Sequence, residues 1–318
     1  MKNSCLKVCF LIGCFAALEV SGQNDFFFNH YMFNPSYFNP AWTGLEDQAF
    51  VAAHHRTQWA GYDASFDPEG APTTQLITAV IPARGRLAGM GISFVNDRTG
   101  PLTSIQARIA LSASFEINSG QLYIGIMPSL NVASINANFR PSDPRADDLI
   151  PIGNESQYRP NLHAGAIFQS ERGYYVGVSA ENILQPSFDF STDASNQIEA
   201  NYNVLFGRPL GISRNLILKP TALVRSDLNS YSLDLTGILE YDEKMWGGLA
   251  FRRSESVSIL LGYSFLEDRK LRAGYSFDYV ISDQDAKEPT SHEIFIRYNL
   301  PDLIFGGRKA VKTPRFAF

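Results

Sequence analysis

Cysteine is confined to the first 22 residues of this sequence. The three cysteines are Cys5, Cys9 and Cys14. That segment has the form of a signal peptide, with Lys2 and Lys7 before an apolar run over residues 8–18 and a small residue, Gly22, at the expected cut. Because cleavage there removes every cysteine, the mature chain would hold no disulfide, no thiol nucleophile and no thiolate-bound metal.

A lipoprotein signal is a second interpretation of the same segment. Leu11, Ile12, Gly13 and Cys14 match a lipoprotein cleavage box, which would place a lipid on Cys14. The apolar run before Cys14 is short, and apolar residues continue beyond it. The pattern therefore favours ordinary cleavage after Gly22.

The sequence also lacks long apolar runs and a strong charge imbalance. No run of about 18 apolar residues follows the N-terminal segment, which excludes a bundle of membrane-spanning helices. The net charge of −5 gives no reason to expect a nucleic-acid partner. The mean hydropathy of −0.12 still permits a membrane β-barrel, because alternating strands average to a neutral value.

Motifs of catalysis and metal binding are missing too. The five histidines form no HExxH pattern and no spaced metal pair, and no GxSxG elbow occurs. His54 and His55 are neighbours and would point to opposite faces of a strand. The acidic stretches at 143–148 and 283–285 do not follow the EF-hand order of ligands and are typical of solvated loops. These patterns favour no metal site and no cofactor, and no motif supports an enzyme, although counting residues leaves a Ser/His/Asp triad open.

The sequence does contain strict alternation of apolar and polar residues. In residues 269–300, Tyr275 and Ile294 belong to apolar rows of two strands, whereas Asp278 and Arg297 belong to polar rows. This pattern predicts fourteen strands, most near the ~9–11 residues that cross a bilayer at a tilt. They span residues 48–59, 72–82, 86–96, 103–117, 120–134, 158–170, 173–184, 199–209, 214–226, 229–241, 244–254, 256–266, 269–281 and 291–300.

The connections between these strands alternate in length along the chain. The even-numbered connections are all short turns. The odd-numbered ones include every long loop, at 60–71, 97–102, 135–157, 185–198 and 282–290. Outer-membrane barrels have short periplasmic turns and longer outer loops. We therefore predict an all-β fold, a transmembrane antiparallel up-and-down β-barrel of about 14 strands. It would lie in the outer membrane of a Gram-negative cell, with both termini periplasmic, apolar rows facing lipid and polar rows lining the lumen.

Residues 23–47 precede the barrel and carry two Asn-Pro steps among aromatic residues. Asn34-Pro35 and Asn39-Pro40 bar a long helix. The aromatic side chains need burial, which favours a plug or cap that closes one end of the barrel over a partner-docking element. The chain thus divides into a signal peptide (1–22), a cap segment (23–47), the barrel (48–300) and a basic tail (301–318), which we place in the periplasm.

Several short motifs occur in an order and spacing that are specific as a set. They are Tyr31-Met32-Phe33-Asn34-Pro35, Asn39-Pro40-Ala41, Arg56-Thr57-Gln58-Trp59-Ala60-Gly61, Gly89-Met90-Gly91, Tyr174-Tyr175-Val176-Gly177-Val178-Ser179, Gly274-Tyr275-Ser276-Phe277-Asp278-Tyr279 and Ser291-His292-Glu293-Ile294. In these motifs, over nearly the whole mature chain, the sequence resembles the PorP/SprF family of outer-membrane proteins of the Bacteroidetes type IX secretion system.

The resemblance implies a barrel that is not an enzyme, with no small-molecule substrate, and that serves protein secretion and gliding motility. Its partners would be type IX secretion components, a large secreted adhesin-like surface protein, or both, besides the lipid bilayer. The residues that we expect to bind a partner are Tyr31, Asn34, Pro35, Asn39, Pro40 and Trp59. Two other functions stay open on the sequence. A barrel of this size suits a passive channel or a transporter of hydrophobic solutes, and a surface-exposed enzyme ranks behind both because no motif supports it.

Overall fold

The computed structural model describes residues 27–62, 70–135, 155–190, 195–266, 269–282 and 288–300. The expected signal peptide with Cys14, the acidic stretches at 143–148 and 283–285, and the basic tail at 301–318 lie outside the described residues.

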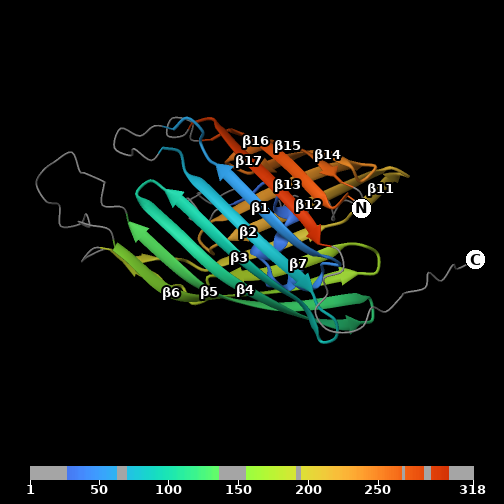
Figure 1. Cartoon of the computed structure of the whole chain (residues 1–318), viewed down its shortest axis with the longest axis horizontal. Helices are drawn as coiled ribbons and strands as arrows, with labels where there is room; N and C mark the ends of the chain where they lie inside the picture. Colours follow the sequence, from blue (N-terminus) through green and yellow to red (C-terminus); the bar gives the residue numbers. More distant parts are fainter. Residues whose placement is uncertain are drawn as a thin grey trace, which may run out of the picture.

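In the part of the chain that the structure describes, fourteen strands form one closed antiparallel ring (Figure 1). Neighbours in sequence pair side by side, and the pairing of the first strand with the last closes the ring. The strands are β1 (Ala49–Thr57), β2 (Thr73–Pro82), β3 (Leu87–Thr99), β4 (Leu102–Ile117), β5 (Gly120–Ile135), β6 (Glu155–Ser170), β7 (Tyr175–Glu181), β10 (Asn201–Gly207), β12 (Leu216–Ser226), β13 (Tyr231–Tyr241), β14 (Met245–Arg252), β15 (Ser256–Phe265), β16 (Leu271–Val280) and β17 (Thr290–Leu300).

Three further strands are short. β8 (Ser187–Asp189) and β9 (Ser195–Gln197) form a small ribbon in the connection between β7 and β10. β11 (Leu210–Ser213) follows β10 and pairs with the start of β12. The closed antiparallel barrel predicted from the alternation is confirmed, with its predicted number of strands.

Each of the fourteen predicted strands is present, and two predicted connections differ for local reasons. The predicted loop at 97–102 is a two-residue turn at 100–101, because β3 and β4 stay paired as far as Thr99 and Leu102. The predicted turn at 210–213 is instead β11. Pro209 has no N–H for the ladder, so it interrupts the strand that begins as β10 without ending the pairing to β12.

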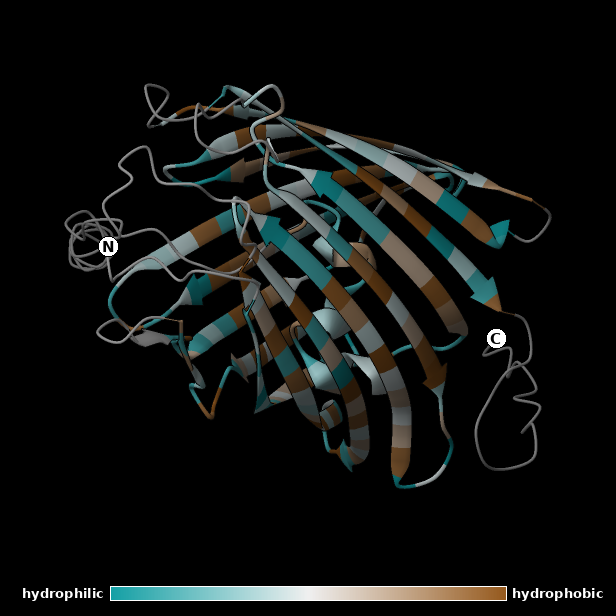
Figure 2. Ribbon diagram, turned by 60° about the vertical axis from the view of Figure 1, so that its left-hand side comes forward, coloured by the Kyte–Doolittle hydropathy of each residue, from teal (hydrophilic) through white to brown (hydrophobic). Residues whose placement is uncertain are grey.

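The outer and inner faces of the wall differ in chemistry, and Figure 2 shows the alternation as bands along each strand. Tyr275 and Ile294 point outward and are 42% and 52% exposed, whereas Asp278 is fully buried on the inner face. Arg297 points inward and donates a hydrogen bond to a carbonyl of the N-terminal segment. The predicted directions of these four side chains are confirmed. An outer face of exposed apolar side chains suits a barrel surrounded by hydrocarbon.

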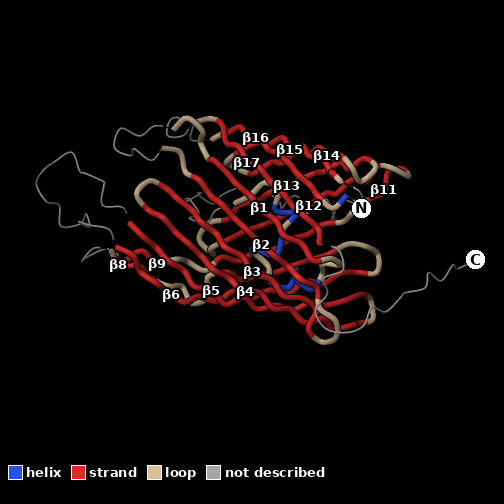
Figure 3. The backbone as a smooth tube through the Cα atoms, viewed as in Figure 1, coloured by secondary structure: helices blue, strands red, loops and turns tan. Residues whose placement is uncertain are grey.

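Residues 27–47, here called the N-terminal segment, lie inside the ring, where Figure 3 shows their helical turns among the strands. They form three 3-10 helices, η1 (Tyr31–Phe33), η2 (Pro35–Tyr37) and η3 (Pro40–Gly44). Each Asn-Pro step starts a new helix, because proline takes its first position. Within the described residues, no helix is both long and apolar enough to cross a membrane.

The two ends of the barrel differ in their connections. The turns at 83–86, 118–119 and 242–244 gather at one end, here called the short-turn end. The strand ends that border the connections at 58–72, 182–200 and 281–289 lie at the other, here called the long-loop end.

The N-terminal segment runs through the interior between these ends. Phe27, the first described residue, lies between Arg225 and Arg252, which stand at the long-loop ends of β12 and β14. The segment then reaches β1 at the short-turn end, where Ala49 pairs with Leu300. The periplasmic location of both termini stays a prediction.

A charge placed on the outer face tests the orientation of the wall. We expect Ile294→Arg to lower the free energy of unfolding in phospholipid vesicles by about 2–4 kcal/mol, the usual cost of arginine on a lipid-facing strand. Leu228→Arg, in the connection between β12 and β13, is the control because Leu228 is 77% exposed outside the strands. Guanidinium titrations measure both values, and equal losses would contradict the lipid-facing assignment of Ile294.

Candidate functional site: the occupied barrel interior

A buried carboxylate of the wall holds the start of the N-terminal segment. Glu293 on β17 is fully buried, and its two oxygens accept the backbone N–H groups of Asn29 at 2.6 Å and His30 at 3.0 Å. The Nδ1 atom of the His30 ring lies 2.8 Å from the same carboxylate. A charge with no water around it needs such partners, so this carboxylate and the segment stabilise each other.

A second set of wall charges surrounds Asn29. The Arg56 guanidinium pairs with Asp278 at 2.6 Å, and both side chains are almost fully buried. The side-chain amide of Asn29 donates one hydrogen bond to the Asp278 carboxylate and another, of 2.8 Å, to the Ser276 hydroxyl. Its oxygen accepts a hydrogen bond from Arg252 at 3.2 Å. One side chain of the segment therefore links strands β14 and β16, which would otherwise face an empty lumen.

The guanidinium groups at the long-loop end also cover the ring of Phe27. The Arg252 Cζ atom lies 3.7 Å from the ring centroid and the Arg225 Cζ atom lies 4.3 Å from it. Arg252 also pairs with Asp234 at 2.7 Å and with Glu255 at 2.8 Å. Cation–π contacts are stronger where water is excluded, up to about 2 kcal/mol, so these contacts add to the hold on the first described residue.

Aromatic side chains fill the middle of the interior. They are Phe27, Phe28, Tyr31, Tyr37 and Phe38, packed with apolar wall residues in one buried cluster. Burial raises the pKa of the Tyr31 and Tyr37 phenols, so both stay neutral. This cluster supplies the apolar burial that the sequence predicted for the aromatic residues of the segment.

Glycines in the wall provide the seat for η3. A Cβ atom placed on Gly89 of β3 would lie 2.0 Å from the Thr43 carbonyl oxygen, and one on Gly125 of β5 would lie 2.4 Å from the Ala41 nitrogen. No side chain fits at either position, so the backbone of the segment rests directly on the backbone of the wall. The Thr43 hydroxyl adds a hydrogen bond of 2.9 Å to Ser112 on β4.

An ion pair holds the other end of the segment, where the chain leaves the interior for β1. Glu46 pairs with Arg297 at 2.7 Å and accepts a hydrogen bond from the Trp42 indole at 3.1 Å. Arg297 also donates to the Phe33 carbonyl at 2.8 Å. The segment is thus fixed at its start, along η3 and at its exit.

The structure places five of the six candidate partner-binding residues inside the barrel. Tyr31, Asn34, Pro35, Asn39 and Pro40 are all buried there. Their neighbours are wall and segment groups: the Asn34 amide donates to Thr78 at 3.1 Å, and the Asn39 amide donates to the Val178 carbonyl at 3.2 Å.

Trp59, the sixth candidate, lies apart from these five at the long-loop end. Its side chain is partly exposed and its backbone φ is +52°. Its backbone N–H donates a hydrogen bond of 3.0 Å to the Ser291 hydroxyl. A partner-binding role for the six residues stays a prediction.

Sequence reasoning missed the wall residues that hold the segment. It assigned Asp278 and Glu293 to the polar rows of their strands, without a partner for either. The available signal was a carboxylate inside a strand, on the face predicted to line the lumen. Among the described residues, no three His, Cys, Asp or Glu side chains are grouped so that they could hold a metal ion. The chemistry of the interior is therefore ion pairing, hydrogen bonding and aromatic packing.

A single methyl group on Gly89 tests the seat of η3. We expect Gly89→Ala to displace η3, because the added atom meets backbone, and overpacking of this kind costs about 1–3 kcal/mol. Amide hydrogen exchange over residues 38–45 should then become about tenfold faster or more. Gly237→Ala is the matched control, since nothing lies within 4 Å of its added Cβ atom. Unchanged exchange in Gly89→Ala would show that the seat is not tight.

Comparisons with solved structures find several that this chain is similar to at low sequence identity. One is a Pseudomonas aeruginosa FadL homologue (13% identity, 87% of this chain, 95% of that chain, TM-score 0.48). A second is the Acinetobacter baumannii outer membrane protein Omp33 (11% identity, 81% of this chain, 100% of that chain, TM-score 0.47). A third is the CymD monoaromatic hydrocarbon channel (12% identity, 88% of this chain, 94% of that chain, TM-score 0.47). This likeness is confined to the barrel fold.

Sequence comparison places the chain in a family. No curated protein matches it. The family model described as "Type IX secretion system membrane protein PorP/SprF" matches residues 20–298. That match covers most of the chain, including the N-terminal segment and nearly all of the barrel. The chain therefore belongs to the PorP/SprF family of type IX secretion system membrane proteins, and its fold is that of an outer-membrane β-barrel.

Proposed function

We propose that this protein is an outer-membrane component of type IX secretion and gliding motility. In this role it supports the export or the surface attachment of a secreted, adhesin-like partner, or links the barrel to periplasmic machinery. The observation that carries the proposal is a barrel of this family whose interior is filled by its own N-terminal segment. A filled interior favours a role as a membrane platform over one as an open pore.

The way the segment is held supports this role. Glu293 fastens its start, wall glycines accept η3, and Arg297 fastens its exit. Breaking one partner of a buried charged pair costs about 3–5 kcal/mol, so release of the segment requires the loss of several such contacts together. We infer that the segment acts as a plug in the resting protein. Partners would then meet the barrel through the connections at its two ends.

Deletion of the gene tests the secretion role. We expect the deletion strain to lose export or surface display of a large secreted adhesin-like protein, and a plasmid copy of the gene to restore both. Immunoblots of cell, surface and medium fractions measure the adhesin. Normal secretion and display in the deletion strain would contradict the proposal.

Ion conductance in planar bilayers separates the platform from the passive channel or hydrophobic-solute transporter. The intact protein should show little steady conductance, because the segment occupies the lumen. Glu293→Ala should show larger and fluctuating conductance, since two backbone N–H groups and His30 lose their acceptor. Glu171→Ala, in an exposed turn, is the control. A large, stable open conductance from the intact protein would favour the channel instead.

A further inference from the structure

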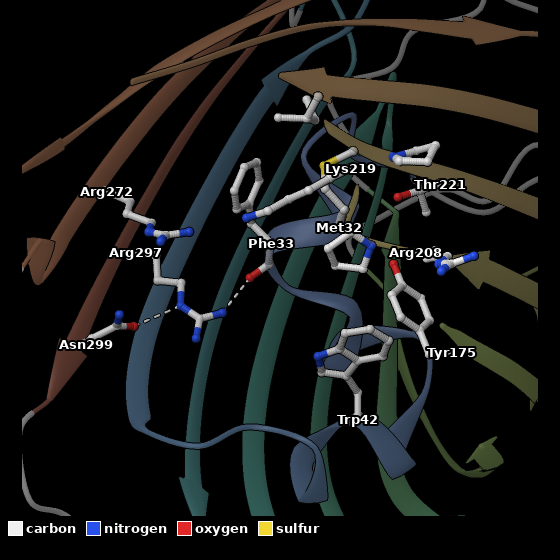
Figure 4. A pocket seen from close by; sticks show the side chains of 13 residues that line it. Met32, Phe33, Trp42, Tyr175, Arg208, Lys219, Thr221, Arg272, Arg297 and Asn299 are labelled. Atoms are coloured by element: carbon white, nitrogen blue, oxygen red, sulfur yellow. Dashed lines mark hydrogen bonds between the residues drawn. The ribbon is translucent and has the colours of Figure 1, made fainter. Parts of the chain in front are cut away.

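The N-terminal segment does not fill the interior evenly. η3 packs against β3, β4, β5 and β6, on one side of the ring. On the other side, at the short-turn end, a cavity of about 280 Å³ remains between the segment and the wall (Figure 4). Its lining comes from η1 and η3, from β7, from the β10–β11 junction and from β12, β13, β16 and β17.

Positive charge dominates this cavity. Its lining contains four cations, Arg208, Lys219, Arg272 and Arg297. Two carboxylates lie next to them: Glu240 pairs with Lys219 at 2.7 Å, and Glu46 pairs with Arg297 at 2.7 Å. Two of the four positive charges are therefore offset, and the cavity keeps an excess of two.

The two cations without a close carboxylate are Arg272 and Arg208. The nearest ion-pair distance of Arg272 is 4.0 Å, to the Glu240 carboxylate that Lys219 already holds. Its Nε atom is buried and has no hydrogen-bond partner among the described residues. Arg208 is exposed at the β10–β11 junction, and within the described ranges its side chain forms no ion pair. Figure 4 shows these two arginines on opposite sides of the cavity.

The rest of the lining is apolar or aromatic. Phe33, Trp42 and Ile238 are buried, and Pro209 and Pro220 lie beside them. A strongly hydrated inorganic anion would leave these surfaces uncovered, whereas an anion with an apolar body would cover them. Guanidinium groups match carboxylates in a planar, two-point geometry. The excess positive charge and the apolar lining of the cavity thus both favour a carboxylate that carries an apolar group.

We propose that this cavity binds an organic carboxylate that carries an apolar group and reaches it from the short-turn end. The Arg272 guanidinium holds the carboxylate, Arg208 across the cavity adds to the positive charge, and Trp42, Phe33 and Ile238 cover the apolar group. The sequence predicts no small-molecule substrate, whereas the geometry of this cavity provides a site for a small ligand. The inference does not depend on the secretion role, because it rests on the cavity alone.

Calorimetric titration of the purified full-length protein in a non-ionic detergent tests the site, with 4-phenylbutyrate as the probe. We expect it to bind at least about tenfold more tightly than its neutral amide, because charge-assisted hydrogen bonds contribute most of the difference. Arg272→Gln should weaken binding by about tenfold, and Arg208→Gln should weaken it by less, because that charge lies across the cavity. Arg214→Gln, an exposed arginine in the turn before β12 and outside the cavity, should leave it unchanged.

A cavity-filling pair of variants tests the location without removing charge. Thr221→Phe places a ring in the cavity and should abolish binding, whereas Thr221→Val keeps the space and should retain binding. Circular dichroism of the barrel confirms that each variant is folded. Binding that survives Thr221→Phe, equal binding of acid and amide, or no binding at millimolar concentration would each overturn the proposal.

Two sources present the same carboxylate chemistry, and the titration distinguishes them. Acetyl-Gly-Phe with a free carboxylate stands for the C-terminus of a peptide, and its C-terminal amide is the matched control. Tighter binding of this peptide than of 4-phenylbutyrate identifies a peptide C-terminus as the ligand. Tighter binding of 4-phenylbutyrate identifies a small organic acid. Either result supports the site, provided that Arg272→Gln weakens the binding of the tighter ligand.

Discussion

The fully buried carboxylate of Glu293 is the interaction on which the interior of this barrel depends. A charge inside a membrane barrel, shielded from water, is costly unless hydrogen bonds replace its hydration. Here the replacements are the N–H groups of Asn29 and His30, from a part of the chain more than 260 residues away. The wall therefore has an inner charge that needs the segment, and the segment has unpaired N–H groups that need the wall. Without this contact, both the Glu293 carboxylate and the N–H groups of the segment would lack hydrogen-bond partners.

The same dependence explains why the interior is asymmetric. Close approach requires glycine, and the glycines at Gly89 and Gly125 lie on β3 and β5, so η3 settles on that side. At the short-turn end the opposite side carries long cationic side chains instead, such as Lys219 and Arg272, which line the cavity. A packed contact and an open cationic cavity are thus two results of one distribution of small and large residues around the ring.

Much of the wall was predictable from the sequence, because a strand pleat forces side chains to alternate between two faces. That rule alone assigned Tyr275 to the outside and Asp278 to the inside. The interruption at Pro209 was not predicted, since the strand pairing continues on both sides of it. The hydrogen bonds of Glu293 could not be predicted from neighbouring residues, because its partners are distant in sequence. Among the candidate partner-binding residues, burial was predicted for aromatic side chains such as Tyr31, whereas the burial of Asn34 against Thr78 was not, because its partner is distant in sequence.

The central claim is that the N-terminal segment is a fixed part of the barrel interior, and a cross-link measures this directly. The Thr43 and Ser112 hydroxyl oxygens are 2.9 Å apart, close enough for a disulfide between cysteines at these positions. The wall pair Ser134 and Ser156, at 2.8 Å, is the control. Mass spectrometry of outer membranes should find Thr43→Cys/Ser112→Cys as fully oxidised as the control pair. Free thiols at positions 43 and 112, with the control oxidised, would contradict the account.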